Sequence, residues 1–117
     1  MSNTQEKEII ELIMATLEDL QAIDIVDLDV RQLTTVTDHM IICSGRSTRH
    51  VKAIAQRLIE NLKAQAHQPA SIAGLPASEW VLVDANDAVV HIMLPEVRDY
   101  YSLEKLWVSG EDVAHEA

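Results

Sequence analysis

One segment of the chain places a buried strand, a tight turn and an amphipathic helix in direct succession. Residues 38–44 (DHMIICS) are apolar without alternation, which predicts a strand that is covered on both faces of a sheet. A Gly-Arg-Ser turn follows at 45–47, and Ser47 is a suitable N-cap for a helix that runs to about Ala66. A doubly covered strand that leads straight into a helix favours an α/β architecture.

Apolar periodicity predicts the other elements. Spacings of three and four residues indicate amphipathic helices, whereas alternation or a short apolar run indicates strands. These patterns predict a helix over 4–21, strands over 24–30, 79–84 and 88–94, and a short helical C-terminal segment up to Trp107. The order of the elements predicts a mixed four- or five-stranded sheet with helices packed on it. The strand at 38–44 is expected to be central, with its neighbours at the edges.

The length of the chain predicts one domain. A chain of 117 residues is long enough for one hydrophobic core and too short to divide comfortably into two. We therefore predict a single domain over 1–117, with a core of about 4–107 and a polar tail over 108–117. Residues 67–78 contain two of the three prolines and are predicted to form a loop.

The net charge of −10 limits the partners that the chain can bind. Duplex DNA, anionic membranes and bare RNA repel a negative surface, so a basic protein surface is the expected complement. No apolar run approaches the ~20 residues of a membrane-spanning helix, and the N-terminus lacks the pattern of a secretory signal. The single cysteine, Cys43, forms no internal disulfide and is predicted to be an inert, buried thiol. We expect a soluble, cytoplasmic protein.

The predicted hairpin of strands 79–84 and 88–94 has two unlike faces. If Asn86 and Asp87 are the turn residues, Trp80 pairs with Met93. The aliphatic face, expected in the core, then consists of Val81, Val83, Val90 and Ile92. The other face consists of Trp80, Leu82, Asp84, His91 and Met93. A mixed face with Trp beside Met is more typical of an interaction surface than of an interior.

The turn at Gly45 is a possible anion site, because Arg46, Arg49 and Lys52 lie near the start of a helix. It lacks the spaced glycines and the Gly-Lys-Ser/Thr element of a phosphate-binding loop. A capped helix with solvated basic residues is the favoured interpretation. A nucleotide- or metal-sensing domain built on this turn is kept as an alternative.

Asp27 and Asp29 lie on one face of the predicted strand, as do carboxylates that hold magnesium in phosphoryl-transfer enzymes. A nucleotidyltransferase places its Gly-Ser element before the carboxylate pair, whereas Gly45 follows the pair here. The order argues against catalysis, and a nucleotidyltransferase-like enzyme is only an alternative.

Two further groups of residues resemble chemical sites without matching a motif. His39, Cys43 and His91 could meet across strands as a zinc site, but they lack the close spacing of zinc motifs. Ser44, Ser47 and His50 supply a hydroxyl and a base, but there is no nucleophile elbow and no orienting acid. We therefore predict no catalytic residue, no metal, no cofactor and no enzymatic activity.

Three blocks of sequence resemble the ribosomal silencing factor family, also called RsfS or Iojap. They are DIVDLDVRQLTTVTDHMIICSGRSTRHVKAIA (24–55), EWVLVDANDAVVHIM (79–93) and RDYYSLEKLW (98–107). The blocks occur in order and cover most of the chain between Asp24 and Trp107. The resemblance implies a homodimer-forming domain with a nucleotidyltransferase-like topology and no transferase activity.

The resemblance also implies a partner and a mechanism. Family members bind the large ribosomal subunit through large-subunit ribosomal protein fourteen, block subunit joining and repress translation under nutrient limitation. The partner-binding positions that match in this chain are Trp80, Met93, Tyr101 and Leu106. The basic residues at 46–52 have two candidate partners, peripheral ribosomal RNA and the second subunit of a dimer.

Overall fold

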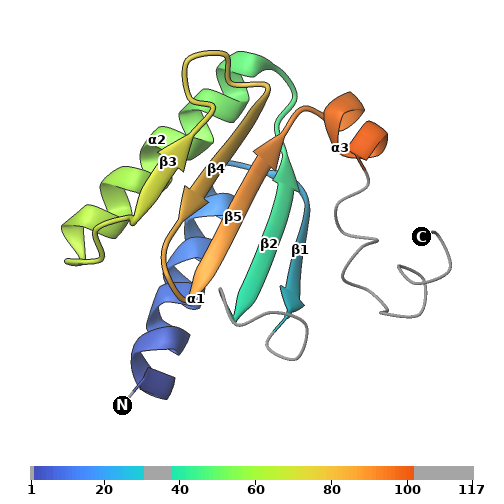
Figure 1. Ribbon diagram of the computed structural model, residues 1–117. Coiled ribbons are helices and arrows are strands. Elements are labelled where there is room, and N and C mark those ends of the chain that lie inside the picture. The colour runs from blue at the N-terminus through green and yellow to red at the C-terminus, as the bar shows by residue number, and fades with distance from the viewer. Residues whose placement is uncertain (1, 31–37, 102–117) are drawn as a thin grey trace, which may run out of the picture.

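The computed structural model describes residues 2–30 and 38–101, and these form one sheet with helices on both of its faces (Figure 1). The elements in chain order are α1 (Ser2–Asp19), β1 (Ile23–Asp29), β2 (His39–Ser44), α2 (Thr48–Ala64), β3 (Ser71–Ala73), β4 (Trp80–Asp84), β5 (Ala88–Met93) and α3 (Pro95–Tyr101). The predicted α/β fold with a mixed sheet is confirmed. The nucleotidyltransferase-like topology stays a prediction.

The sheet has five strands in the order β1-β2-β5-β4-β3. β2 and β5 run parallel, and every other neighbouring pair is antiparallel. The central strand is therefore β5. We predicted that the strand at 38–44, which is β2, would be central with an edge strand on each side. β2 instead lies between the edge strand β1 and the central strand β5. β1 is at one edge as expected, and the short strand β3 forms the other edge.

Strand β3 corrects the prediction that residues 67–78 are only a loop. Its three residues pair with β4, with Ile72 opposite Val83. All three side chains are exposed, so no alternation of apolar and polar residues marks the strand in the sequence. The pairing of its backbone with β4 defines it.

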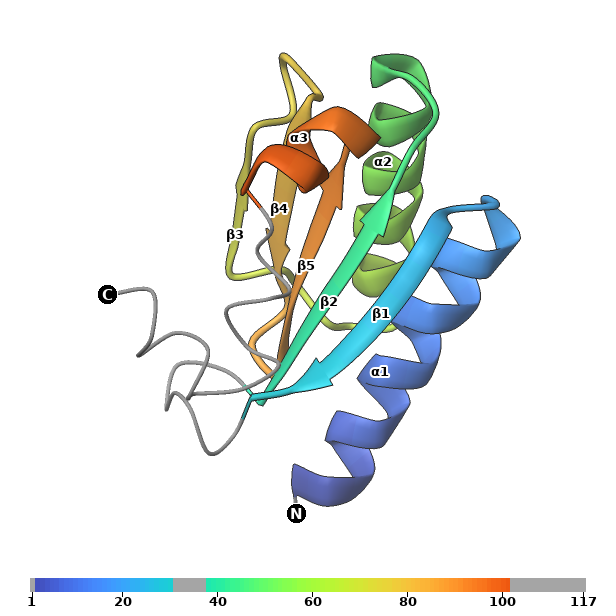
Figure 2. The ribbon, with the colours of Figure 1, turned by 90° about the vertical axis from the view of Figure 1, so that its right-hand side faces the viewer.

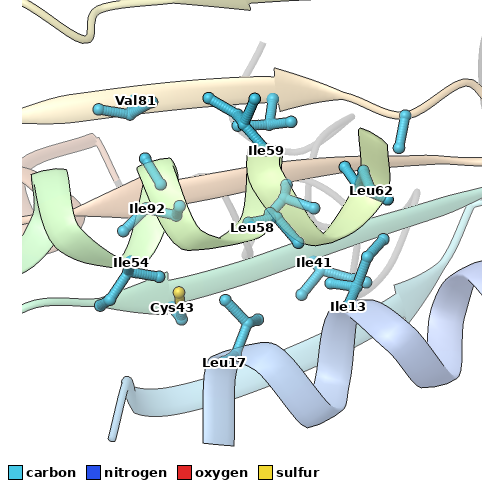
Figure 3. Close-up of a cluster of buried hydrophobic side chains, with 14 of the residues drawn as sticks. Ile13, Leu17, Ile41, Cys43, Ile54, Leu58, Ile59, Leu62, Val81 and Ile92 are labelled. Carbon is cyan, nitrogen blue, oxygen red and sulfur yellow. The ribbon is translucent and has the colours of Figure 1, made fainter. Parts of the chain in front are cut away.

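The main hydrophobic core lies between the sheet and the two long helices, α1 and α2, which cover the same face (Figure 2). The helices contribute Ile13 and Leu17 from α1 and Ile54, Leu58 and Leu62 from α2 (Figure 3). Cys43 lies among them with no exposed surface. Burial raises the pKa of its thiol to about 12, so the thiol stays protonated near neutral pH, in agreement with the predicted inert cysteine.

The turn before α2 forms as predicted, and it needs its glycine. The Ser47 side chain caps the helix by accepting a hydrogen bond from the His50 amide at 3.1 Å. A Cβ atom on Gly45 would lie 2.7 Å from Val51 Cγ2 and 2.9 Å from the Val51 amide nitrogen. Only glycine therefore lets the end of β2 approach the first turn of α2 so closely.

His39 ties α1 to the edge of the sheet. Its Nδ1 lies 2.8 Å from Asp27 Oδ1 on β1, and its Nε2 lies 2.9 Å from Glu6 Oε2 on α1. Burial lowers the pKa of His39, but the hydrogen bonds and charges of Asp27 and Glu6 outweigh it and raise the pKa above its ordinary value of 6.5. In the charged form both ring nitrogens donate to a carboxylate.

The stabilisation from His39 should depend on pH. Because the folded-state pKa is raised, the contribution is fully present below about pH 6.5 and is lost as the pH rises through the folded pKa. We expect His39→Gln to lower the free energy of unfolding more at about pH 6 than at about pH 9, as measured by urea denaturation.

His67→Gln is the matched control, because the His67 side chain has no ion pair within residues 2–30 and 38–101. If His39→Gln loses equal stability at both pH values, the charged form of His39 does not stabilise the fold as we infer.

Candidate protein-binding surface

The face of the sheet opposite α1 and α2 carries a second, smaller hydrophobic cluster. Its buried members are Val30, Met40, Ile42 and Met93, and its partly buried members are Leu28, Trp80 and Val97. Val97 belongs to α3, so this short helix packs on the end of the cluster. We call the half-buried side chains of Trp80, Leu82, Val89 and Val97 on this face the Trp80 surface.

The pairing of β4 with β5 confirms the predicted register. Trp80 pairs with Met93, and Leu82 pairs with His91. The four aliphatic residues predicted for the core, Val81, Val83, Val90 and Ile92, all belong to the cluster beneath the helices. The hairpin therefore has the two unlike faces that the sequence indicated.

The structure corrects the predicted exposure of Met93. We expected Met93 to lie open beside Trp80, yet its side chain has 0% exposure. It is buried in the small cluster to which Val97 of α3 also belongs. Trp80 remains half-buried, so in this chain Trp80 forms part of the surface and Met93 supports it from below.

Trp80 is held in place by His91. The indole Nε1 donates a hydrogen bond to His91 Nδ1 at 3.0 Å, and the ring centroids lie 5.9 Å apart at an angle of 47°. Burial lowers the pKa of His91 to about 4, so the imidazole is neutral near pH 7 and Nδ1 can accept this bond. The large apolar ring is thus fixed before any partner binds, which reduces the entropy lost on binding.

Arg98 anchors α3 to the sheet. Its side chain is buried, with 8% exposure, and its Nη1 donates to Ser44 Oγ at 3.2 Å and to the Ile23 carbonyl at 3.5 Å. Arg98 has no role in the prediction from sequence. The sequence does contain one indication of such a role, because Arg98 is a basic residue between the acidic Glu96 and Asp99 in a short helix. Its contacts, 54 and 75 residues away in the chain, have no local pattern.

The four predicted contact residues are only partly described. Trp80 and Met93 come together as a cross-strand pair. Tyr101 is the last residue of α3, the helix that packs against this pair, but its side chain lies outside the described residues. The whole of Leu106 also lies outside them.

The residues considered for zinc binding or magnesium binding do not assemble into such sites. His91 lies on the opposite face of the sheet from His39 and Cys43, because it packs beside Trp80 while Cys43 belongs to the core under the helices. Asp27 is hydrogen-bonded to His39. Among the described residues no group of three His, Cys, Asp or Glu is placed to hold a metal ion.

The hydroxyl and imidazole groups near the Gly45 turn have structural partners. Ser44 accepts a hydrogen bond from Arg98, and Ser47 caps α2. His50 Nε2 donates to the Leu20 carbonyl at 2.8 Å, while its Nδ1 accepts from the Arg46 amide at 2.9 Å. The imidazole therefore links two turns of the chain and contacts neither serine hydroxyl as a base.

No described helix has the length and apolar character needed to cross a bilayer.

Comparison with known proteins finds relatives over most of the chain. A family model described as "Ribosomal silencing factor during starvation" matches residues 3–117. The chain is 40% identical over 104 residues to the ribosomal silencing factor RsfS of Zymomonas mobilis, covering 89% of this chain and 78% of the relative. It is 38% identical over 101 residues to the mouse protein "Mitochondrial assembly of ribosomal large subunit protein 1", covering 84% of this chain and 44% of the mouse protein.

A solved structure supports the same relationship. The crystal structure of a protein from Chromobacterium violaceum is similar with a TM-score of 0.84 and 46% sequence identity, covering 86% of this chain and 84% of that chain. The resemblance of the three sequence blocks to the RsfS family is thus confirmed by both sequence and fold. The chain belongs to the ribosomal silencing factor family.

Proposed function

We propose that this protein binds the large ribosomal subunit through large-subunit ribosomal protein fourteen, blocks subunit joining and so represses translation under nutrient limitation. The supporting observation is the Trp80 surface, where a large aromatic side chain is held rigidly by His91 above a buried apolar cluster. Membership of the family supports an action on the ribosome. The name of the mouse relative points to the large subunit.

The mechanism that we propose is steric and requires no catalysis. The carboxylate, histidine and serine groups weighed as chemical sites are engaged in contacts that stabilise the fold, such as Asp27 with His39 and Ser44 with Arg98. A protein that acts by occupying a surface needs rigid shape and complementary charge. We propose that it is a binding protein rather than an enzyme, and that it works in the cytoplasm as a homodimer.

Charge supports a basic protein partner. Glu96 and Asp99 are exposed on α3, next to the Trp80 surface, and the chain as a whole carries −10. Acidic groups at the rim of an apolar patch speed association with a basic surface and orient it. We propose that Trp80, Tyr101 and Leu106 make the contact, with Met93 supporting Trp80 from beneath.

The function is tested by adding the purified protein to separated ribosomal subunits. It should sediment with large subunits, and it should reduce their joining to small subunits when added first. If the protein fails to sediment with large subunits, or binds them without slowing joining, the proposed function is wrong.

Truncating Trp80 should weaken binding to large subunits. Aromatic residues at the centre of an interface commonly contribute about 2 kcal/mol or more, so Trp80→Ala should lower the affinity at least about thirtyfold. Trp80→Phe keeps an aromatic ring but loses the hydrogen bond to His91, so its affinity should lie between those of the unaltered protein and Trp80→Ala. Affinity is measured by sedimentation and folding by circular dichroism.

Ile72→Ala is the matched control, because Ile72 is an apolar residue, 39% exposed, on the edge strand β3. It pairs with Val83, which lies on the opposite face of the sheet from Trp80. A folded Trp80→Ala protein with unchanged affinity would show that the contact lies elsewhere.

Removing the donors of Arg98 should release α3 and weaken binding. Arg98→Met keeps the apolar stem but leaves Ser44 Oγ and the Ile23 carbonyl without this donor. We expect faster amide exchange in α3, with little change in β5, and several-fold weaker binding to large subunits. Arg98→Lys should restore part of the slow amide exchange in α3 and part of the affinity for large subunits. If amide exchange in α3 and affinity for large subunits are both unchanged in Arg98→Met, Arg98 does not position α3 for binding.

A further inference from the structure

The basic residues of this acidic protein are concentrated around α2. Residues 45–68 hold five of the nine Lys and Arg residues but only one of the 19 Asp and Glu residues. The five are Arg46, Arg49, Lys52, Arg57 and Lys63. The charge of the protein is therefore bipolar, with a positive region on one helix and negative charge over the remainder.

Among the described residues, three of these cations near the start of α2 have no ion pair. Arg57 Nε lies 3.8 Å from Glu60 Oε1 in an exposed ion pair. Arg46, Arg49 and Lys52 have no carboxylate partner in the part of the chain that the structure describes. All three are exposed, and Arg49 and Lys52 are three residues apart on α2 and hence neighbours on the helix surface. We call Arg46, Arg49 and Lys52 the basic patch.

The basic patch adjoins a concave surface. A pocket of about 360 Å³ lies between the start of α2 and the segment that leads into β4, lined by Thr48, Arg49, Lys52, Pro76, Ala77 and Ser78. The Ser78 hydroxyl is used within the chain, where it donates to the Leu75 carbonyl. Arg49 and Lys52 are the charged groups that line the pocket, so it suits an anion.

Two backbone donors beside the basic patch are already engaged within the chain. The amide of Arg46 donates to His50 Nδ1, and the amide of His50 donates to Ser47 Oγ. The guanidinium and ammonium groups of the basic patch have no carboxylate partner among residues 2–30 and 38–101. These groups bind phosphate oxygens without regard to base sequence, which is how proteins contact a nucleic-acid backbone.

The basic patch lies at the end of the sheet that carries Trp80 and the start of α3. The Gly45 amide donates to the Met93 carbonyl at 3.0 Å, and the Leu94 amide donates to the Glu79 carbonyl at 3.0 Å. These bonds place the Gly45 turn, the start of β4 and the start of α3 at one end, which is the upper end in Figure 1. A single large partner can therefore reach both regions.

We propose that the basic patch contacts phosphates of the ribosomal RNA backbone beside the protein that the Trp80 surface binds. This inference rests on the proposed function. A bipolar protein suits a partner surface made of both RNA and basic protein, because each part attracts one pole and repels the other. The negative remainder confines RNA contact to the patch and so fixes the orientation on the ribosome.

The salt dependence of binding tests the contact. Arg49→Gln together with Lys52→Gln removes two phosphate contacts, so the slope of log affinity against log salt should fall in magnitude by about 1.5. Arg57→Gln together with Lys63→Gln makes the same charge change further along α2 and should leave the slope unaltered. Trp80→Ala should lower the affinity without altering the slope.

Cross-linking identifies what the patch touches. The native Cys43 is buried and unreactive, so a photo-cross-linker can be attached selectively to Thr48→Cys at the pocket or to Ala64→Cys at the other end of α2. On large subunits, Thr48→Cys should label RNA strongly and Ala64→Cys weakly.

The outcomes separate this inference from the proposed function. If the unaltered protein binds large subunits but the Arg49/Lys52 variant keeps its full salt slope, or if Thr48→Cys labels only ribosomal protein, the RNA contact is wrong and the proposed function stands. If the same variant instead turns a dimer into a monomer in sedimentation and keeps the slope, the patch joins two copies of the chain. If the unaltered protein does not bind large subunits, the proposed function fails first.

Discussion

The pairing of β4 with β5 decides which side chains of the hairpin face the helices and which face away. The turn between them sets this register. Asn86 adopts a φ of 71°, which asparagine tolerates, and its amide donates to Asp84 Oδ1 at 2.9 Å. A slip by one residue would move Trp80 into the main core and expose the aliphatic face. The core beneath the helices and the Trp80 surface therefore depend on one turn.

The two faces of the sheet have different roles. On one face, α1 and α2 bury a continuous aliphatic core, and His39 links α1 to β1 and β2 through two carboxylates. On the other face, a small cluster supports Trp80, and a buried arginine and a neutral histidine hold α3 and the indole in place. Polar groups inside the molecule thus position the Trp80 surface.

Much of this structure could be predicted from local sequence. Ser47 as N-cap, the strand and helix order, the hairpin register and the aliphatic core follow from periodicity and turn chemistry over a few residues. The three sequence blocks identified the family. Trp80 could be assigned to the correct face because the turn fixes the alternation.

The remaining features depend on contacts that have no local pattern. The exposed strand β3 is defined only by backbone pairing, and β5 is central only because β2 pairs with it in parallel. Met93 is buried through the same cluster as Val97 of α3, and Arg98 and His39 find partners on distant elements. These arrangements appear once the elements are packed together.

The central claim is that the Trp80 surface meets the large subunit and that α1, on the opposite face of the sheet, does not. Oxidative footprinting of side chains, read by mass spectrometry with and without purified large subunits, tests it most directly. Oxidation of Trp80 should fall on binding, while that of Met14, partly buried on α1, should stay the same. Unchanged oxidation of Trp80 together with protection of Met14 would contradict the account.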